Sequence, residues 1–274
     1  MEILKKRKLI WVFLLTLITP GLGQIYNGML KKGVTYAVAL ELVLLVFSPL
    51  LLNFYGMICY LAIIIGVIIF ILLEALLKAK RLGEIALKPY NKWYIYLLIF
   101  LLSSFAIHPF LSWIIKNNIA KAYKIPSSGM EPTLLDGDHL IANMKPYKGE
   151  TPKRGDIVIF EYPKDPSKDF IKRVIGLEGE KVEIIGSRIR INDQLIEDPW
   201  GYYSETSVIP KAIPALEQFG PVVVPKDSIF VMGDNRNNSH DSRFWGFVHI
   251  RQMKGKALYI YWATRKSRIG KEIK

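Results

Sequence analysis

The sequence predicts a protein in two parts: an N-terminal α-helical membrane region and a C-terminal all-β domain with a loop-rich insertion. Hydrophobic residues make up 51% of the 274 residues and are concentrated before residue 116, which argues against one large soluble core. After that point apolar residues recur in short alternating runs separated by turn residues, a pattern typical of β-barrels and sandwiches. The length suits one membrane region and one domain of ordinary size.

Four apolar segments lie within the predicted membrane region, residues 1–115. The first, residues 9–28, begins with about ten apolar residues, fewer than the ~20 that span a bilayer, and Pro20 and Gly21 then break the helix. We interpret this segment as a broken or re-entrant hairpin, with a complete span as the alternative. Three further stretches are apolar and long enough to cross: residues 33–52, 57–77 and 93–115.

The net charge of +13 comes largely from basic residues at the ends of these apolar segments. The loop at residues 78–92 holds five basic residues and one acidic residue. The positive-inside rule predicts a cytoplasmic loop, and therefore a multi-pass protein of the cell membrane with its C-terminal domain outside. Such basic residues also suit anionic lipid head groups. No basic-aromatic module accompanies them, so we expect the lipid bilayer and no nucleic acid as a partner.

Residues 116–262 form the predicted β domain. Its strand-like runs are residues 156–162, 170–175, 181–185, 188–192, 228–232 and 255–262. Residues 197–225 lack this alternation, and we interpret them as an insertion that could be a lid, a binding arm or decoration. We expect the basic residues 263–274 to form a disordered tail that faces solvent.

Metal and disulfide chemistry finds little support in the sequence. The single cysteine, Cys59, lies within an apolar run, so no intrachain disulfide and no cysteine-based metal site can form. The four histidines lack the spacing of metal ligands. We therefore expect no metal and no other cofactor.

Two serines and a lysine are the candidates for nucleophilic chemistry. Ser127 and Ser128 lie in a Pro/Gly turn just after the last span. Lys172 interrupts an apolar strand, where alternation places it on one face with Phe170 and Val174. Burial disfavours an ammonium ion and lowers its pKa, and a neutral lysine can take a proton from a serine. The alternative is that Lys172 simply reaches solvent.

The densest polar stretch, Gly233–Gly246, follows a predicted strand. Its Asp, Asn and Ser residues are typical of a structural loop, because they support their own backbone turns. The functional alternative is that Ser239 and Asp241 support a base or pair with an arginine.

Four blocks, in order, resemble the bacterial type I signal peptidases, membrane-bound leader peptidases of the serine–lysine class (S26 family). The blocks are residues 125–138, 153–160, 169–176 and 233–248. The resemblance covers about residues 116–262 and implies a signal-peptidase-like fold. It also implies a serine endopeptidase that cleaves N-terminal signal peptides from exported pre-proteins.

The resemblance also implies a role for each matching residue. Lys172 matches the general base, Ser127 the hydroxyl that completes the oxyanion hole, and Ser239 the serine that hydrogen-bonds the lysine. Asp241 and Arg243 match a supporting ion pair. The residues that match the pockets for small side chains before the cut are Ile125, Met130, Leu134, Phe170 and Ile171.

Gly129 departs from the family pattern, because it stands where the family has its nucleophilic serine. Three explanations are open: the protein is an inactive variant, Ser128 attacks after a local backbone shift, or residue 129 is recorded in error. The permissive glycine beside Ser128 would ease such a shift. The functional alternatives are a non-catalytic homologue that binds signal peptides or a membrane partner, and a purely structural membrane protein.

Overall fold

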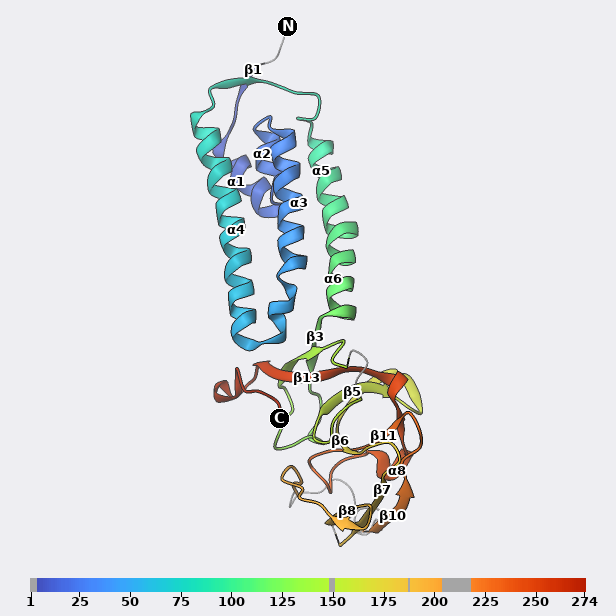
Figure 1. Cartoon of the computed structure of the whole chain (residues 1–274). Coiled ribbons are helices and arrows are strands. Elements are labelled where there is room, and N and C mark those ends of the chain that lie inside the picture. Colours follow the sequence, from blue (N-terminus) through green and yellow to red (C-terminus); the bar gives the residue numbers. More distant parts are fainter. Residues whose placement is uncertain (1–3, 148–150, 187, 204–217) are drawn as a thin grey trace. The chain divides into compact units, whose positions relative to one another are not determined.

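The computed structural model describes residues 4–147, 151–186, 188–203 and 218–274, which belong to two compact units, Met1–Ile119 and Ala120–Lys274 (Figure 1). The first unit is built mainly from apolar helices and the second from antiparallel sheets. The predicted fold class is therefore confirmed.

Three helical segments of the first unit are apolar and long enough to cross a bilayer; they contain 23, 28 and 26 residues, against the ~20 required. The first joins α3 (Leu30–Val46) to the 3₁₀ turn η1 (Ser48–Leu52). The second is α4 (Phe54–Arg81). The third joins α5 (Trp93–Leu102), the π-helical turn η2 (Ser103–Ile107) and α6 (His108–Asn118).

Two short helices, α1 (Leu9–Ile18) and α2 (Leu22–Tyr26), precede these spans. Ten residues of α-helix extend about 15 Å, half of a bilayer's hydrocarbon core. α1 and α2 both lie against the last three turns of α4: Val12 packs on Ala75 and Ala79, and Gln24 Nε2 donates to the Ile71 carbonyl at 2.8 Å. At ten residues, α1 alone is too short to cross a bilayer.

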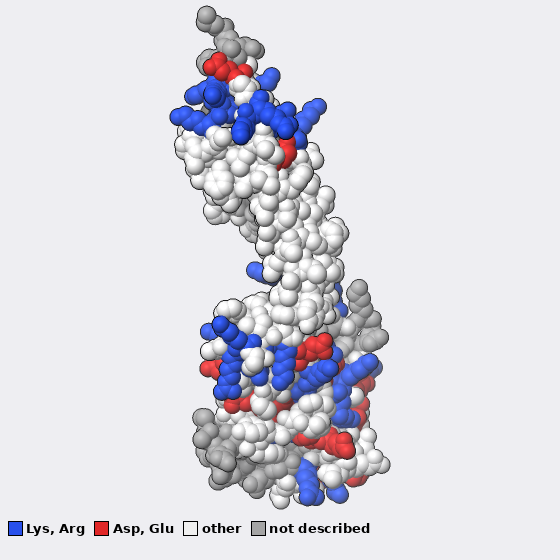
Figure 2. Space-filling model, turned by 90° about the vertical axis from the view of Figure 1, so that its left-hand side faces the viewer, with Lys and Arg blue, Asp and Glu red and all other residues white. Residues whose placement is uncertain are grey.

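Basic residues gather at one end of the helical unit. β1 (Leu4–Lys6) pairs with β2 (Glu84–Ala86), which brings the basic start of the chain beside the loop after α4. Lys32 forms an ion pair with Glu74 at the same end. Figure 2 shows Lys and Arg concentrated there, above a largely uncharged helical surface.

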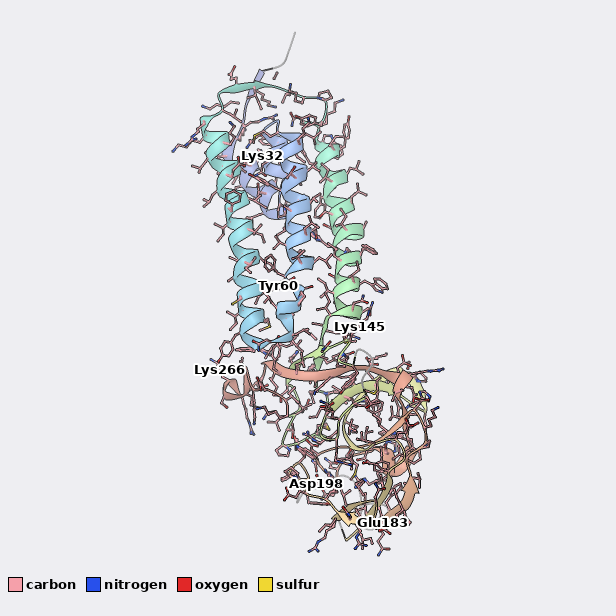
Figure 3. The ribbon with its side chains drawn as sticks, viewed as in Figure 1. Lys32, Tyr60, Lys145, Glu183, Asp198 and Lys266 are labelled. Carbon is pink, nitrogen blue, oxygen red and sulfur yellow. The ribbon has the colours of Figure 1, made fainter. Side chains whose placement is uncertain are left out.

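Polar contacts also join the spans. Glu41 Oε1 of the first span lies 2.9 Å from His108 Nδ1 of the third, and His108 Nε2 lies 3.2 Å from Ser103 Oγ of its own span. Tyr60 of α4 (labelled in Figure 3) donates from its hydroxyl to the Leu44 carbonyl at 3.1 Å. Hydrogen bonds of this kind hold neighbouring membrane helices together.

The second unit contains a seven-stranded sheet in the order β12-β11-β6-β5-β13-β4-β3 and a four-stranded sheet in the order β10-β7-β8-β9. The bounds of the first are β3 (Ala120–Lys124), β4 (His139–Asn143), β5 (Ile157–Tyr162), β6 (Asp165–Gly176), β11 (Ser228–Met232), β12 (Val248–His249) and β13 (Met253–Trp262). Those of the second are β7 (Lys181–Ile185), β8 (Arg188–Ile191), β9 (Gln194–Leu195) and β10 (Gln218–Val223). Every strand pair is antiparallel.

The expected insertion at residues 197–225 is partly regular. Its final part forms β10, which pairs with β7 at the edge of the smaller sheet. Gly220 and Pro221 interrupt the apolar alternation of this strand, which explains why the sequence pattern did not reveal it. Residues 204–217 of the insertion lie outside the described residues.

The expectation of a disordered tail at residues 263–274 is wrong, although basic residues such as Lys266 and Lys271 do face solvent. The Ile260 amide donates to the Lys271 carbonyl, and Ile273 is only 9% exposed within the main core cluster. Arg268 Nη2 donates to Asp138 Oδ2 at 2.6 Å. The segment folds back because β13 offers free backbone groups and Asp138 offers a buried carboxylate, which local composition does not reveal.

Candidate active site

Lys172 lies on β6 with its side chain buried; the residue is 8% exposed. Strand alternation turns it to the face that also holds Phe170, whose ring centroid lies 6.0 Å from Nζ. Burial lowers the pKa of Lys172 below the ordinary lysine value. The negative charges of Asp241 and Asp234 oppose this shift, and the positive charge of Arg243 adds to it. A buried lysine with a depressed pKa is suited to act as a base near neutral pH.

The turn that follows β3 brings Gly129, not Ser128, beside this lysine. A Cβ atom placed on Gly129 would lie 3.3 Å from Lys172 Nζ and 3.5 Å from the Asn238 carbonyl oxygen. The Gly129 φ lies outside the left-handed region, so the backbone would accept an L-residue. A serine hydroxyl, one bond beyond that Cβ, would come within reach of Nζ.

Ser128 is instead tied to the polar loop. Its Oγ accepts a hydrogen bond from Asn238 Nδ2 at 2.8 Å, and its carbonyl accepts one from Asn235 Nδ2 at 3.1 Å. These contacts would have to break for Ser128 to approach the lysine. Ser127 is exposed to solvent in the same turn.

The polar loop after β11 packs its backbone closely against the turn. A Cβ on Gly233 would lie 2.2 Å from Ser239 Oγ and 2.3 Å from the Gly129 carbonyl oxygen, so only glycine fits there. Ser239 is 1% exposed, and its Oγ has no hydrogen-bond partner within the described parts of the chain. The structure therefore brings Ser239, Gly129 and Lys172 into one neighbourhood.

Asp241 and Arg243 form an ion pair behind this loop. Arg243 Nε donates to Asp241 Oδ1 at 2.8 Å, and the Gly233 amide donates to Asp241 Oδ2 at 3.0 Å. Burial alone would raise the pKa of Asp241, but the charge and hydrogen bonds of Arg243 and the amide hold it below its ordinary value. Asp241 thus stays ionised, and it fixes the start of the loop.

Two further ion pairs were not anticipated from the sequence. Arg173 and Asp234 are fully buried and joined by two hydrogen bonds of 2.7 and 2.6 Å. Arg236, also buried, pairs with Asp198 from the first part of the insertion. Arg173 lies next to Lys172 inside an apolar strand, and this position indicates a buried acidic partner. The sequence does not identify which residue that partner is.

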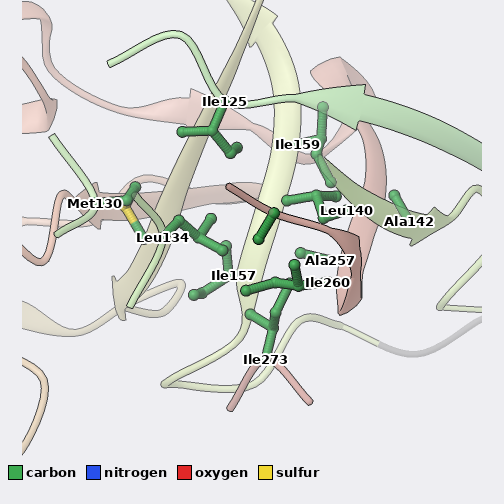
Figure 4. Close-up of a cluster of buried hydrophobic side chains, with 11 residues drawn as sticks. Ile125, Met130, Leu134, Leu140, Ala142, Ile157, Ile159, Ala257, Ile260 and Ile273 are labelled. Carbon is green, nitrogen blue, oxygen red and sulfur yellow. The ribbon is translucent and has the colours of Figure 1, made fainter. Parts of the chain in front are cut away.

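The five expected pocket residues divide between two hydrophobic clusters. Ile125, Met130 and Leu134 are buried in the main core (Figure 4). Ile171 is partly buried and packs against the same core. Phe170 belongs to another cluster, where its ring stacks on Tyr162 with centroids 4.4 Å apart.

The described residues contain no group of three or more His, Cys, Asp or Glu side chains that could hold a metal ion. The arrangement instead provides a buried amine beside a turn that holds two serines and the buried Gly129. It suits chemistry in which a serine is activated by a lysine.

The chain is similar in sequence to known proteins of one family. Residues 94–262 match the family model described as signal peptidase, peptidase S26. The signal peptidase I of Leptolyngbya laminosa is 41% identical over 160 residues, which cover 56% of this chain and 73% of that protein. The signal peptidase I of Aquifex aeolicus is 35% identical over 202 residues, which cover 55% of this chain and 79% of that protein.

Proposed function

Because the chain belongs to the peptidase S26 family of signal peptidases, we propose that its β domain carries a serine–lysine endopeptidase site. The substrates are the signal peptides of exported pre-proteins. The site is built for a nucleophilic hydroxyl at position 129. The observation that supports this most is the 3.3 Å between a Cβ on Gly129 and Lys172 Nζ. Ser128, by contrast, is hydrogen-bonded to Asn238.

The mechanism follows from these positions. Neutral Lys172 takes the proton of a serine hydroxyl at position 129 as the oxygen attacks the scissile carbonyl carbon. Ser127 and a backbone N–H stabilise the oxyanion. Lys172 then gives the proton to the leaving amine. In the second step the same lysine takes a proton from a water molecule, which hydrolyses the acyl-enzyme. No metal or histidine takes part.

The membrane arrangement belongs to the same proposal. The gathering of Lys and Arg at one end of the helical unit supports a cytoplasmic location for that end. If α1 and α2 do not cross, three spans place the β domain outside the cell membrane, where exported pre-proteins emerge. The lipid bilayer is then a partner, and no nucleic acid is required.

Gly129 favours a second candidate, a homologue that binds signal peptides without cutting them. Glycine has no side-chain hydroxyl with which to form an acyl-enzyme, while the other residues that match the site are present. The two candidates differ in one measurable property, cleavage by the chain with Gly129.

Cleavage of a pre-protein in detergent micelles tests both, with three chains: the chain with Gly129, Gly129→Ser and Ser128→Ala. We expect Gly129→Ser to cleave and the chain with Gly129 to bind the pre-protein with little or no cleavage. If the Gly129 chain cleaves and Ser128→Ala abolishes that cleavage, the result would support Ser128 as a shifted nucleophile instead. An inactive Gly129→Ser would contradict the proposed site as a whole.

A further inference from the structure

The first part of the insertion is docked on the polar loop of the candidate site. The Tyr202 amide donates to the Asp234 carbonyl at 2.8 Å, and the Arg236 amide donates to the Tyr202 carbonyl at 2.7 Å. Tyr202 and Asn235 form a parallel bridge. Two backbone bonds of this kind fix how residues 198–202 lie against the loop.

Asp198 and Arg236 connect the same two segments through their side chains. Arg236 is 1% exposed and donates from both terminal nitrogens to the Asp198 carboxylate, with Nη2 2.6 Å from Oδ1. Its Nε donates to the Gly233 carbonyl at 3.1 Å. A carboxylate held by two parallel hydrogen bonds fixes the plane of a guanidinium, so Asp198 determines where Nε points.

Gly233 is the point at which this contact reaches the site. It lies so close to Ser239 Oγ and to the Gly129 carbonyl that a Cβ would overlap both. Arg236 holds its carbonyl, and Asp241 holds its amide. A shift of Gly233 would therefore change the spacing between the loop that bears Ser239 and the turn beside Lys172.

Trp200 adds a second contact from the same segment. The centre of its ring lies 4.7 Å from the Arg173 guanidinium carbon. A Cβ atom on Gly155 would lie 2.8 Å from Cζ2 of the same ring. The segment thus touches two of the three buried arginines around the site.

We propose that Asp198 is a positioning residue: through Arg236 and Gly233 it sets the distance between the Ser239 loop and the Gly129 turn beside Lys172. This role rests on the function proposed above. It makes the start of the insertion part of the active-site framework, without contact between Asp198 and the substrate.

The catalytic test compares Asp198→Asn with Asp193→Asn in the full chain carrying Gly129→Ser. Asp193 is the matched control, because its carboxylate pairs with Lys181 at 2.6 Å on the exposed surface of the neighbouring hairpin. A misplacement of ~1 Å can cost about a hundredfold in rate. We expect Asp198→Asn to lower kcat about 10- to 100-fold with KM changed less than about twofold, Asp198→Glu to recover much of it, and Asp193→Asn to change neither.

A second test needs no cleavage and uses the chain with Gly129. The rate at which Lys172 reacts with an amine reagent, followed by peptide mass spectrometry against pH, reports its pKa. The charged groups that act on Lys172 are Asp241, Asp234 and Arg243, and Lys172 in turn acts on His240. Loss of the Asp198 charge alone would lower the lysine pKa, whereas a loosened loop that admits water would raise it.

We expect an upward shift of the Lys172 titration in Asp198→Asn and none in Asp193→Asn. An unchanged or lowered titration together with unchanged kcat would overturn the proposal, even if Asp198→Asn lowers the melting temperature, because the pair would then be structural only. An inactive Gly129→Ser chain would contradict the proposed function, and the labelling experiment would still test the role of Asp198.

Discussion

The two sides of the candidate site are built differently. On one side, Lys172 is buried beside Phe170, and the charges of Asp241, Arg243 and Asp234 in and around the polar loop act on it. On the other, the turn at residues 127–129 has an exposed serine, a half-buried serine and a glycine where the reactive hydroxyl is expected. The lysine side depends on many buried contacts, so changing it should affect folding, whereas changing the turn should affect chemistry alone.

The largest effect is expected where a buried charge loses its partner. Arg173→Met leaves the buried Asp234 carboxyl group without its partner, which costs about 3–5 kcal/mol of unfolding free energy. The matched control is Arg190→Met, which removes the partly exposed pair with Glu183. It should change the free energy of unfolding by less than ~1 kcal/mol. Denaturant titration followed by tryptophan fluorescence measures both. Equal, small losses would mean that the lysine side does not depend on this pair.

A smaller effect, on rate alone, is expected in the turn. In the Gly129→Ser chain, Ser127→Ala removes the proposed oxyanion donor and should lower kcat about 10²- to 10³-fold. Because Ser127 is exposed, the free energy of unfolding should change by no more than ~0.5 kcal/mol. Steady-state cleavage and denaturant titration give the two values. A large loss of stability with normal kcat would reverse the contrast between the two sides.

The smallest effect is the dependence on pH. The Gly129→Ser chain needs neutral Lys172, so its kcat/KM should fall about tenfold per pH unit below the pKa of this lysine. Burial lowers that pKa, so the rate should stop rising well below the ~10.4 of an ordinary lysine. His240→Gln is the control, because burial lowers the pKa of His240 as well. A rate that still rises above pH ~10 would contradict a buried base.

Sequence periodicity predicted much of the fold because the patterns that encode it are local. The apolar spans and strands such as β5, β7 and β11 lie where hydrophobic runs or alternation place them. Two short strands, β3 and β4, were not predicted, since five residues beside a span or a polar turn give little alternation. The Gly/Pro-interrupted β10 was missed for a related reason.

The sequence by itself determined the residue types of the site: a lysine inside an apolar strand, a polar loop, and a glycine in place of a serine. Only the tertiary structure decided which of them meet. It placed Gly129 rather than Ser128 beside Lys172, joined Arg173 to Asp234 across 61 positions, and folded the basic tail onto the core. The physical reason is that such contacts depend on strand register and loop closure, which are set by residues far apart in the chain. Hydrophobic periodicity, by contrast, can be recognised within a few consecutive residues.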